Sequence, residues 1–213
     1  MVKLIEKPHL SKAAAKRLSL YLRCLNELNT AGVTKIRSSE FSRLTQVGSA
    51  TIRRDFSQVG ELGRSGYGYD VAYLIKVFNE LLDVHDEKRI ALIGCGNLGQ
   101  ALLKNNFRRN ANLNISCAFD NDPEKIGREV AGQIIQPLEN LPQLVAQENI
   151  SVAISTVPSQ FSQAAVNAIV KSGLTAILNF APDPVDVPPT VNVHYIDLTT
   201  ELQTLIYFDE QSE

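Results

Sequence analysis

The sequence predicts an α/β protein with an N-terminal winged helix-turn-helix unit, a Rossmann-type parallel-sheet unit and a C-terminal helix. Three observations predict this fold class. Apolar residues recur at helical spacing over residues 11–82, short apolar runs alternate with helical segments from Arg89 onward, and a glycine-rich loop follows the first of these runs. We expect the three parts to comprise residues 1–84, 85–196 and 197–213.

The composition is that of a folded chain able to bury a core, with 44% hydrophobic and 21% charged residues among 213. No apolar run approaches the roughly 18 residues that span a membrane, and no export signal is visible, so we expect a cytoplasmic protein. Cys24, Cys95 and Cys117 form no CxxC pair, which favours reduced thiols and argues against a metal site.

The first two predicted helices open the N-terminal unit. A long helix is expected after the cap residue Ser11, because apolar residues follow at helical spacing. These residues are Leu18, Tyr21, Leu22, Leu25 and Leu28. A shorter helix is expected over residues 39–45, with Ser39 as its cap and with Phe41 and Leu44 facing inward.

The rest of this unit has the pattern of a DNA reader. A third helix is expected to begin at the cap residue Ser49, to run for about ten residues and to bury Ile52 and Phe56. A glycine-punctuated hairpin at 60–68 then forms a wing, and a fourth helix covers 70–82. A short helix, a turn and a helix rich in Ser, Thr and Arg are typical of helix-turn-helix proteins.

The distribution of charge favours DNA contact by the first unit only. Residues 1–64 contain 12 Lys and Arg against 5 Asp and Glu, whereas residues 65–213 contain 9 against 18. Arginine is the best reader of guanine, and we expect Asp55 to pair with a neighbouring arginine rather than to face DNA. The candidate DNA-contacting residues are Lys16, Arg17, Ser49, Thr51, Arg53, Arg54 and Arg64.

The second unit alternates between strands and helices. Strands are expected at 90–93, 115–119, 150–154 and 176–178, and helices at 97–103 and 160–172. Strands separated by helices predict a parallel sheet with right-handed crossovers and helices on both faces. Residues 198–208 carry one apolar helical face, which must dock on another surface because so short a helix is marginal alone.

A GxGxxG loop stands between the first strand and the first helix of this unit. The first glycine allows a tight turn, the second lets a pyrophosphate approach the helix N-terminus, and the third lets the helix pack on the sheet. Asp120 follows 21 residues after the loop and would bind the adenine ribose, which favours NAD(H) over NADP(H), although Arg128 weakens that exclusion. The candidate nucleotide-binding residues from this pattern are Gly94, Cys95, Gly96, Asn97, Leu98, Gly99 and Asp120.

The sequence offers no proton relay of the kind that a dehydrogenase needs beside the nicotinamide. His9 and His85 precede the first strand of the nucleotide fold, His194 lies near its end, and no Tyr-x-x-x-Lys pattern exists. A bound nucleotide without surrounding chemistry indicates a sensed ligand, so we expect no enzymatic activity. Cys95 could be a redox-reactive thiol, but we favour its interpretation as a small residue that fills the loop.

Further motifs are spread over most of the chain: Ala15–Leu18, Arg53–Val71, Gly94–Gly99, Phe119–Pro123, Thr156–Pro158, Asn179–Pro182 and Asp197–Gln203. With these motifs, residues 8–208 resemble the Rex family of bacterial redox-sensing repressors. The resemblance implies a homodimer with a swapped C-terminal helix that binds NADH and NAD⁺. It also implies repression of fermentative or anaerobic-respiration genes, relieved when NADH rises relative to NAD⁺.

Control of DNA binding is expected to depend on the redox state of the nicotinamide. The uncharged reduced ring can be enclosed at the interface of the nucleotide domains, near Thr156, Val157, Pro158 and Phe180, whereas NAD⁺ brings a positive ring that disfavours closure. Closure would rotate the two recognition helices out of register with an inverted-repeat operator.

Two positions depart from the family pattern. Asn105 stands where Rex proteins commonly carry a tyrosine, which bonds the other subunit's aspartate at the position of Asp197. Leu198 stands where some members have a phenylalanine that enters the neighbour's cofactor pocket. The resemblance therefore implies that Asp197 and Leu198 form an interdomain switch whose contacts differ from those of the family.

Three other interpretations stay open on the sequence alone. The chain could be an NAD-dependent dehydrogenase, which turnover of a hydroxy or keto substrate would establish. It could be a module for another nucleotide such as coenzyme A, which tighter binding of coenzyme A than of NADH would support. It could be a DNA-binding protein with a vestigial glycine loop, in which case operator binding would not respond to NADH.

Overall fold

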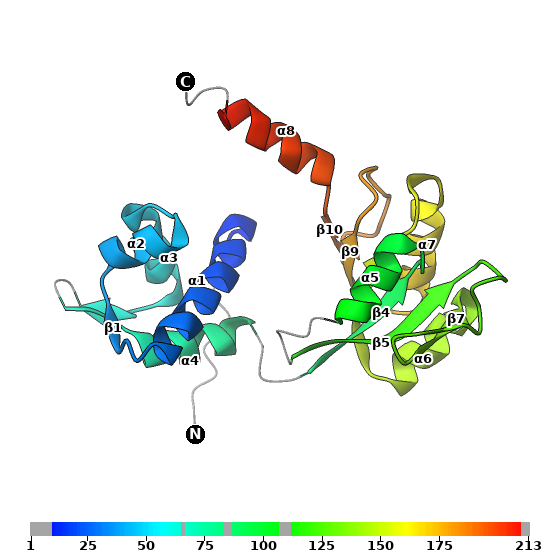
Figure 1. Ribbon diagram of the computed structural model, residues 1–213, viewed down its shortest axis with the longest axis horizontal. Helices are drawn as coiled ribbons and strands as arrows, with labels where there is room; N and C mark the ends of the chain where they lie inside the picture. The colour runs from blue at the N-terminus through cyan, green and yellow to red at the C-terminus, as the bar shows by residue number, and fades with distance from the viewer. Residues whose placement is uncertain (1–9, 65–66, 83–86, 107–111, 210–213) are drawn as a thin grey trace. The chain divides into compact units, whose positions relative to one another are not determined.

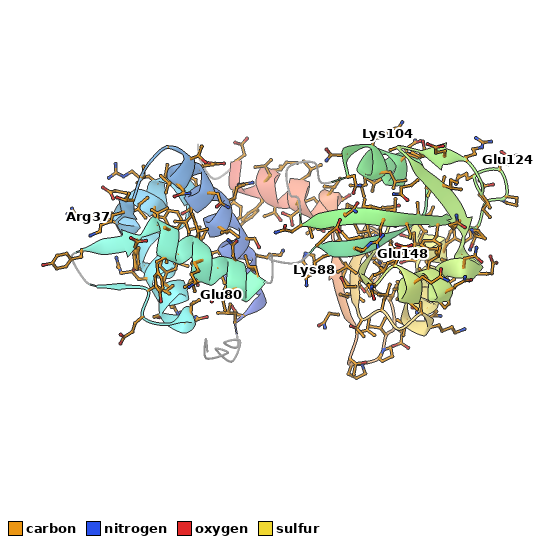
Figure 2. The ribbon with its side chains drawn as sticks, turned by 90° about the horizontal axis from the view of Figure 1, so that it is seen from below. Arg37, Glu80, Lys88, Lys104, Glu124 and Glu148 are labelled. Carbon is orange, nitrogen blue, oxygen red and sulfur yellow. The ribbon has the colours of Figure 1, made fainter. Side chains whose placement is uncertain are left out.

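The structure is a computed structural model that describes residues 10–64, 67–82, 87–106 and 112–209. Contacts within the chain divide it into two compact units, Met1–Asp86 and Glu87–Glu213, which we describe separately (Figure 1). Charged side chains such as Arg37 in the first unit and Lys104 and Glu124 in the second lie at the surface (Figure 2). No helix within the described ranges is long and apolar enough to cross a membrane.

The N-terminal unit combines helices with a small antiparallel sheet. Its elements are α1 (Lys12–Thr30), β1 (Lys35–Ile36), α2 (Ser38–Thr45), α3 (Ser49–Val59), β2 (Gly63–Arg64), β3 (Gly68–Asp70) and α4 (Val71–Leu82). Strand β3 pairs antiparallel with β1 on one side and with β2 on the other. The hairpin of β2 and β3 follows α3, which is the winged helix-turn-helix arrangement that the sequence predicts.

An aromatic cluster joins the helices of this unit. Tyr21 of α1, Phe41 of α2 and Phe78 of α4 are fully buried, and Phe56 of α3 is 2% exposed. Phe56 packs edge-on against Tyr21 and Phe78, with ring centroids 5.6 and 5.4 Å apart. The inner face of α3 is therefore fixed by the core, and its opposite face is left to solvent.

The expected helix starts are partly right. Ser11 caps α1 as predicted, its hydroxyl accepting the N–H of Ala14 at 3.2 Å. Ser39 and Ser49 are not caps, because α2 begins one residue earlier, after Arg37, and α3 already begins at Ser49. Arg37 is well placed to begin α2, because its N–H donates to the Glu40 carboxylate at 2.8 Å.

The expected inward orientation of Leu44 is wrong. Its side chain is 53% exposed, although Phe41 is buried as predicted. Phe41 and Thr45 are four residues apart and share the inner face of α2, and residue 44 lies to one side of that face.

The C-terminal unit is built around one mainly parallel sheet. Its elements are β4 (Lys88–Ile93), α5 (Asn97–Asn105), β5 (Leu113–Asp120), β6 (Glu129–Val130), β7 (Gln133–Pro137), the 3₁₀ turn η1 (Leu138–Asn140), α6 (Leu141–Gln147), β8 (Ile150–Ser155), α7 (Ser159–Lys171), β9 (Ala176–Asn179), β10 (Asn192–Tyr195) and α8 (Leu198–Asp209). The strand order is β10-β9-β8-β4-β5-β7-β6, with only β6 antiparallel among these pairs. The parallel strands move outward from β4 through β5 to β7 on one side and then from β8 to β10 on the other, so the order reverses between β4 and β8.

The two faces of this sheet are covered unequally. Ile90 and Leu92 of β4 pack on the same side as Leu103 of α5, whereas Ala91 and Ile93 face α6 and α7. No helix joins β9 to β10 in residues 180–191, so α5 alone covers its face within the described part of the unit. The half of that face formed by β8–β10 is left without a covering helix.

Every residue of helix α8 is exposed in the single chain. Its apolar side chains are between 56% and 67% exposed: Leu198, Leu202, Leu205, Ile206, Tyr207 and Phe208. The apolar face that the sequence predicts is thus present, and the described residues of its own unit do not cover it. Such a helix needs a second surface to be stable.

Candidate nucleotide site and DNA-binding surface

Two glycines of the glycine loop, Gly94 and Gly99, stand where no other residue would fit. Gly94 directly follows β4 with φ of 94°, and a Cβ there would lie 2.9 Å from Val157 Cγ1. A Cβ on Gly99 would lie 2.1 Å from the Gly94 carbonyl oxygen, so α5 packs against the loop as closely as glycine allows. A Cβ on Gly96 would meet nothing within 4 Å. Space is therefore left beside Gly96, at the N-terminus of α5.

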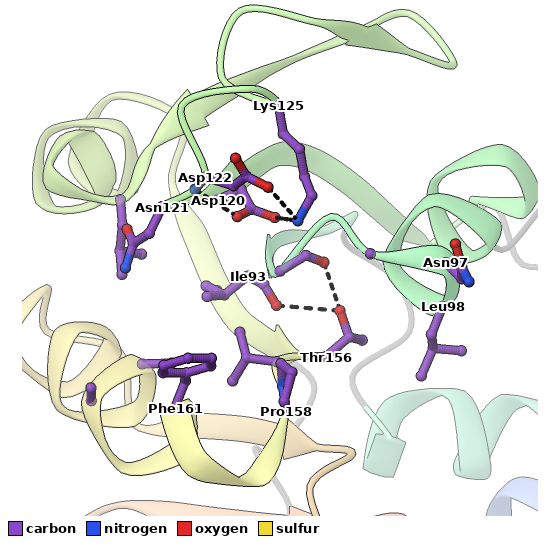
Figure 3. A pocket seen from close by; sticks show the side chains of 16 residues that line it. Ile93, Asn97, Leu98, Asp120, Asn121, Asp122, Lys125, Thr156, Pro158 and Phe161 are labelled. Atoms are coloured by element: carbon purple, nitrogen blue, oxygen red, sulfur yellow. Dashed lines mark hydrogen bonds and ion pairs between the residues drawn. The ribbon is translucent and has the colours of Figure 1, made fainter.

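A cavity of about 660 Å³ opens at this point (Figure 3). It lies at the carboxyl ends of β4, β5 and β8, where the strand order reverses and where doubly wound sheets bind their ligands. Its lining residues are Ile93, Gly94, Gly96, Asn97, Leu98, Asp120, Asn121, Asp122, Lys125, Leu138, Thr156, Val157, Pro158, Phe161, Ala164 and Ala165. The volume suits a cofactor-sized ligand, and the free N–H groups of α5 suit a phosphate.

Asp120 lies at the edge of this cavity in a fixed orientation. Its carboxylate accepts the N–H of Cys95 at 2.7 Å and the N–H of Asp122 at 2.9 Å. Lys125 also donates to it, at 3.2 Å, and lies 3.4 Å from the Asp122 carboxylate. Burial alone would raise the pKa of Asp120, but these hydrogen bonds hold it below its usual value. The group is therefore ionised and able to accept hydrogen bonds from ribose hydroxyls.

Thr156 connects the two halves of the site. Its hydroxyl donates to the carbonyl oxygen of Gly94 at 2.7 Å and lies 3.3 Å from that of Ile93. The segment after β8 is thereby held against the turn after β4. A ligand that lies across the point where the strand order reverses, between β4 and β8, would contact both segments.

Three residues predicted at the nucleotide site do not line the cavity. Gly99 packs on Gly94 as described, and Phe180 is half-buried in the core on the α5 face. Cys95 is fully buried, its thiol pointing to the Phe119 carbonyl oxygen at 3.5 Å. Burial raises the pKa of Cys95 to about 12, so the thiol has little of the thiolate character that redox reactivity requires.

Several lining residues were missed by sequence reasoning. Lys125 was missed because the turn that begins at Asp122 carries it back toward Asp120, and helical or strand spacing does not predict such a turn. Phe161 is one of the regularly spaced apolar residues in the helix predicted over 160–172, and it is 56% exposed and borders the cavity. The sequence signal for Lys125 is a cation shortly after an acidic strand end.

The outer face of α3 in the N-terminal unit is basic. Arg53 and Arg54 are exposed, and Ser49 and Thr51 are half-buried in the first turn. Arg53 also donates to the Ser38 hydroxyl at 3.3 Å, which joins it to the start of α2. Lys16 is exposed on α1. Arg64 lies on β2, but its side chain is outside the part that the structure describes.

Arg17, which is half-buried, and Asp55, which is buried, form an ion pair. Arg17 donates two hydrogen bonds to the Asp55 carboxylate, at 2.6 and 2.7 Å, and Tyr21 donates a third at 2.8 Å. Burial alone would raise the pKa of Asp55, but these bonds lower it. Asp55 thus pairs with an arginine of α1, which sequence proximity did not identify. Arg17, predicted at DNA, has a structural partner instead of a free guanidinium.

Comparison with known proteins identifies the family. A family model described as a CoA binding domain matches residues 85–183, and the model Put_DNA-bind_N, for a DNA-binding protein N-terminus, matches residues 9–57. The redox-sensing transcriptional repressor Rex 2 of Enterococcus faecalis is 64% identical over 199 residues, 93% of either chain. The chain belongs to the Rex family of redox-sensing transcriptional repressors.

Other members agree over the whole length. Rex of Latilactobacillus sakei is 48% identical over 204 residues, which are 96% of this chain and 98% of that protein. The crystal structure of RSP, a Rex-family repressor, in complex with β-NADH matches with a TM-score of 0.84 and 28% identity, covering 96% of both chains. RSP in complex with β-NAD⁺ and operator DNA matches with a TM-score of 0.86 and 30% identity, covering 99% of this chain and 95% of that one.

The switch residues suggested by the Rex resemblance lie at the start of α8. Asp197 accepts the N–H of Thr199 at 2.9 Å and the hydroxyl of Thr200 at 2.6 Å, and the Thr200 bond lowers its pKa. Asp197 therefore acts as a cap of α8 in the single chain. Leu198 and Asn105 are both exposed.

Proposed function

We propose that this Rex-family chain is a homodimeric repressor that binds operator DNA and releases it when NADH occupies the Rossmann unit. The observation that carries the proposal is the similarity, over nearly the whole chain, to RSP structures with NADH and with NAD⁺ and operator DNA. The relatives are named repressors, so the nucleotide acts as a signal and is not turned over. Such a protein acts where the DNA is, in the cytoplasm.

The nucleotide site supports NAD(H) as the ligand. The opening beside Gly96 and the N-terminus of α5 suit a pyrophosphate. Asp120 suits the hydroxyls of the adenine ribose, and Thr156 and Pro158 lie on the side where the nicotinamide would be. The buried thiols argue against redox sensing by cysteine oxidation, because burial raises the pKa of Cys24, Cys95 and Cys117.

The DNA site is the exposed face of α3 with its flanking basic residues. We propose that Arg53, Arg54, Ser49 and Thr51 read an operator in the major groove. The candidate phosphate contact is Lys16, and the wing with Arg64 reaches the neighbouring backbone or minor groove. The target genes belong to fermentation or anaerobic respiration.

Dimerisation follows from the surfaces that the single chain leaves open. The apolar face of α8 needs covering, and Val152 and Leu178 on the half of the sheet without a helix are only half-buried. A two-fold dimer also matches an inverted repeat, because each recognition helix reads one half-site. We propose that α8 is exchanged between subunits.

The test is an electrophoretic shift of an inverted-repeat operator in the presence of NADH or NAD⁺. We expect NADH to weaken the affinity for the operator by about a hundredfold, which corresponds to about 2.7 kcal/mol of coupling free energy. NAD⁺ should leave the operator bound. Arg54→Ala should abolish the shift and leave NADH binding intact. Operator binding that is indifferent to NADH would contradict the proposal.

Coenzyme A is the second candidate ligand, because a CoA binding domain model matches residues 85–183. Coenzyme A carries a phosphate on its ribose, next to the hydroxyl that Asp120 would bind. The ionised carboxylate would repel that phosphate, so we favour NAD(H). Release of operator by coenzyme A at lower concentration than by NADH would reverse this preference.

A further inference from the structure

The inner face of α3 carries a carboxylate that is buried as deeply as its apolar neighbours. Asp55 is 1% exposed, between Ile52 at 0% and Phe56 at 2%. A buried ionised carboxylate is costly unless it is paired and hydrogen-bonded. The position and orientation of α3 therefore depend on the groups that hydrogen-bond to Asp55.

Two side chains of α1 meet it. Arg17 donates from Nε to Asp55 Oδ2 at 2.6 Å and from Nη2 to Oδ1 at 2.7 Å, and the Tyr21 hydroxyl donates to Oδ2 at 2.8 Å. The planar fork of an arginine matches two carboxylate oxygens, and a lysine cannot reproduce that match. The contact therefore fixes both distance and orientation between α1 and α3.

This contact determines which side of α3 faces solvent. Arg54 directly precedes Asp55 and is exposed, and Thr51 lies one turn earlier. Successive helical residues are about 100° apart around the axis, so an anchor at Asp55 sets the direction of Arg54. A helix rotated about its axis would present other side chains to the bases.

We propose that Arg17 is a positioning residue for operator recognition, which acts through Asp55 and not through a DNA phosphate. This inference rests on the proposed DNA-binding function and replaces the phosphate contact that the sequence predicts for Arg17. Its charge is neutralised by Asp55, and its side chain is 28% exposed. Lys16, the preceding residue, is exposed and serves as the matched control.

The test compares operator and non-specific duplex affinities of the full chain over a series of salt concentrations. Arg17→Lys keeps the positive charge and loses the fork, so we expect about a tenfold loss of operator affinity with unchanged non-specific affinity and salt slope. Lys16→Gln should lower the salt slope by about one unit and keep the ratio of operator to non-specific affinity. Loss of fold alone would lower the operator and the non-specific affinity of Arg17→Lys together and would leave their ratio unchanged.

A double variant keeps the test decisive if Arg17→Lys weakens the fold of the unit. In Arg17→Gln with Asp55→Asn both charges are removed together, and the two amides can hydrogen-bond. We expect a wild-type salt slope, because no phosphate contact is lost. A slope lower by about one unit, or an Arg17→Lys chain with wild-type operator affinity, would overturn the proposal. If the wild-type chain itself bound no operator, the proposed function would fail, before any variant is compared.

Discussion

Gly96 is the residue whose replacement tests the nucleotide site most directly. A side chain there would extend into the cavity beside the N-terminus of α5, because no atom lies within 4 Å of its Cβ position. Gly96→Val should weaken NADH binding by at least about a hundredfold, since a branched side chain would fill the space of the pyrophosphate. Fluorescence titration of NADH measures this, with operator binding as the control for folding. A variant that NADH still releases from DNA would show that Gly96 is not at the pyrophosphate.

Replacing Asp120 and replacing Lys125 should change the preference for NADH over NADPH in opposite directions. Asp120→Asn removes a charge that repels a 2′-phosphate, so the preference for NADH over NADPH should fall by about tenfold. Lys125→Gln removes the cation that partly neutralises Asp120 and Asp122, so the preference should rise several-fold. Calorimetric titration with both nucleotides measures the ratio, with Lys104→Gln as an exposed control. Equal weakening of both ligands by Lys125→Gln would mean that Lys125 only supports the loop.

Residue types predicted the site better than they predicted its details. The glycine pattern and Asp120 were expected at the site because each has a fixed chemical task at a fixed distance from a strand end, and Thr156 was expected from the Rex resemblance. Gly94, Gly96, Asp120 and Thr156 all line the cavity. Lys125 and Phe161 were not predicted at the site. The position of Lys125 depends on the turn that begins at Asp122, and that of Phe161 depends on which side of α7 borders the cavity. Phe180 was expected at the nicotinamide, but its side chain packs in the core on the α5 face.

At the scale of elements, α3 depends on an ion pair that acid should break. The folded pKa of Asp55 is lowered, so its contribution to stability is fully present above the unfolded carboxyl pKa of about 3.9. The contribution is lost as the pH falls through the lower folded value. The protection of the α3 amides from hydrogen exchange, measured relative to the intrinsic exchange rate at each pH, should therefore fall in acid in the wild-type full chain. The fall should be smaller in Asp55→Asn, and identical profiles would contradict this role of the pair.

Sequence periodicity predicted the long elements and missed the short ones. A period is visible where an element has enough apolar residues, as in the helices α1, α4 and α7 and the buried strands β4, β5 and β8. β6 has two residues, and β10 alternates between exposed and half-buried positions, so neither gives a strong apolar signal. The cap residues of α2 and α3 lie earlier than predicted, at Arg37 and Gly48 and not at Ser39 and Ser49. Serine is only one of several residues that can stand before a helix.

At the scale of the whole molecule, α8 is the element on which the proposed dimer depends. Leu202→Glu together with Leu205→Glu should give monomers, because both side chains are more than half exposed in the single chain and need an apolar cover. Operator affinity should fall by about a hundredfold or more, since a monomer reads one half-site. Analytical ultracentrifugation measures the assembly, and Gln203→Glu on the same helix is the control. If the double variant remains dimeric, the apolar face of α8 is not part of the dimer interface.

The proposed coupling between NADH binding and operator binding is reciprocal by thermodynamic linkage. If NADH weakens operator binding by a given factor, operator must weaken NADH binding by the same factor. The most direct measurement is a calorimetric titration of NADH into the chain alone and into the chain saturated with an inverted-repeat operator. We predict that the dissociation constant of NADH rises on DNA by about a hundredfold, equal to the loss of operator affinity that NADH causes. An NADH affinity that is the same with and without operator would contradict the account.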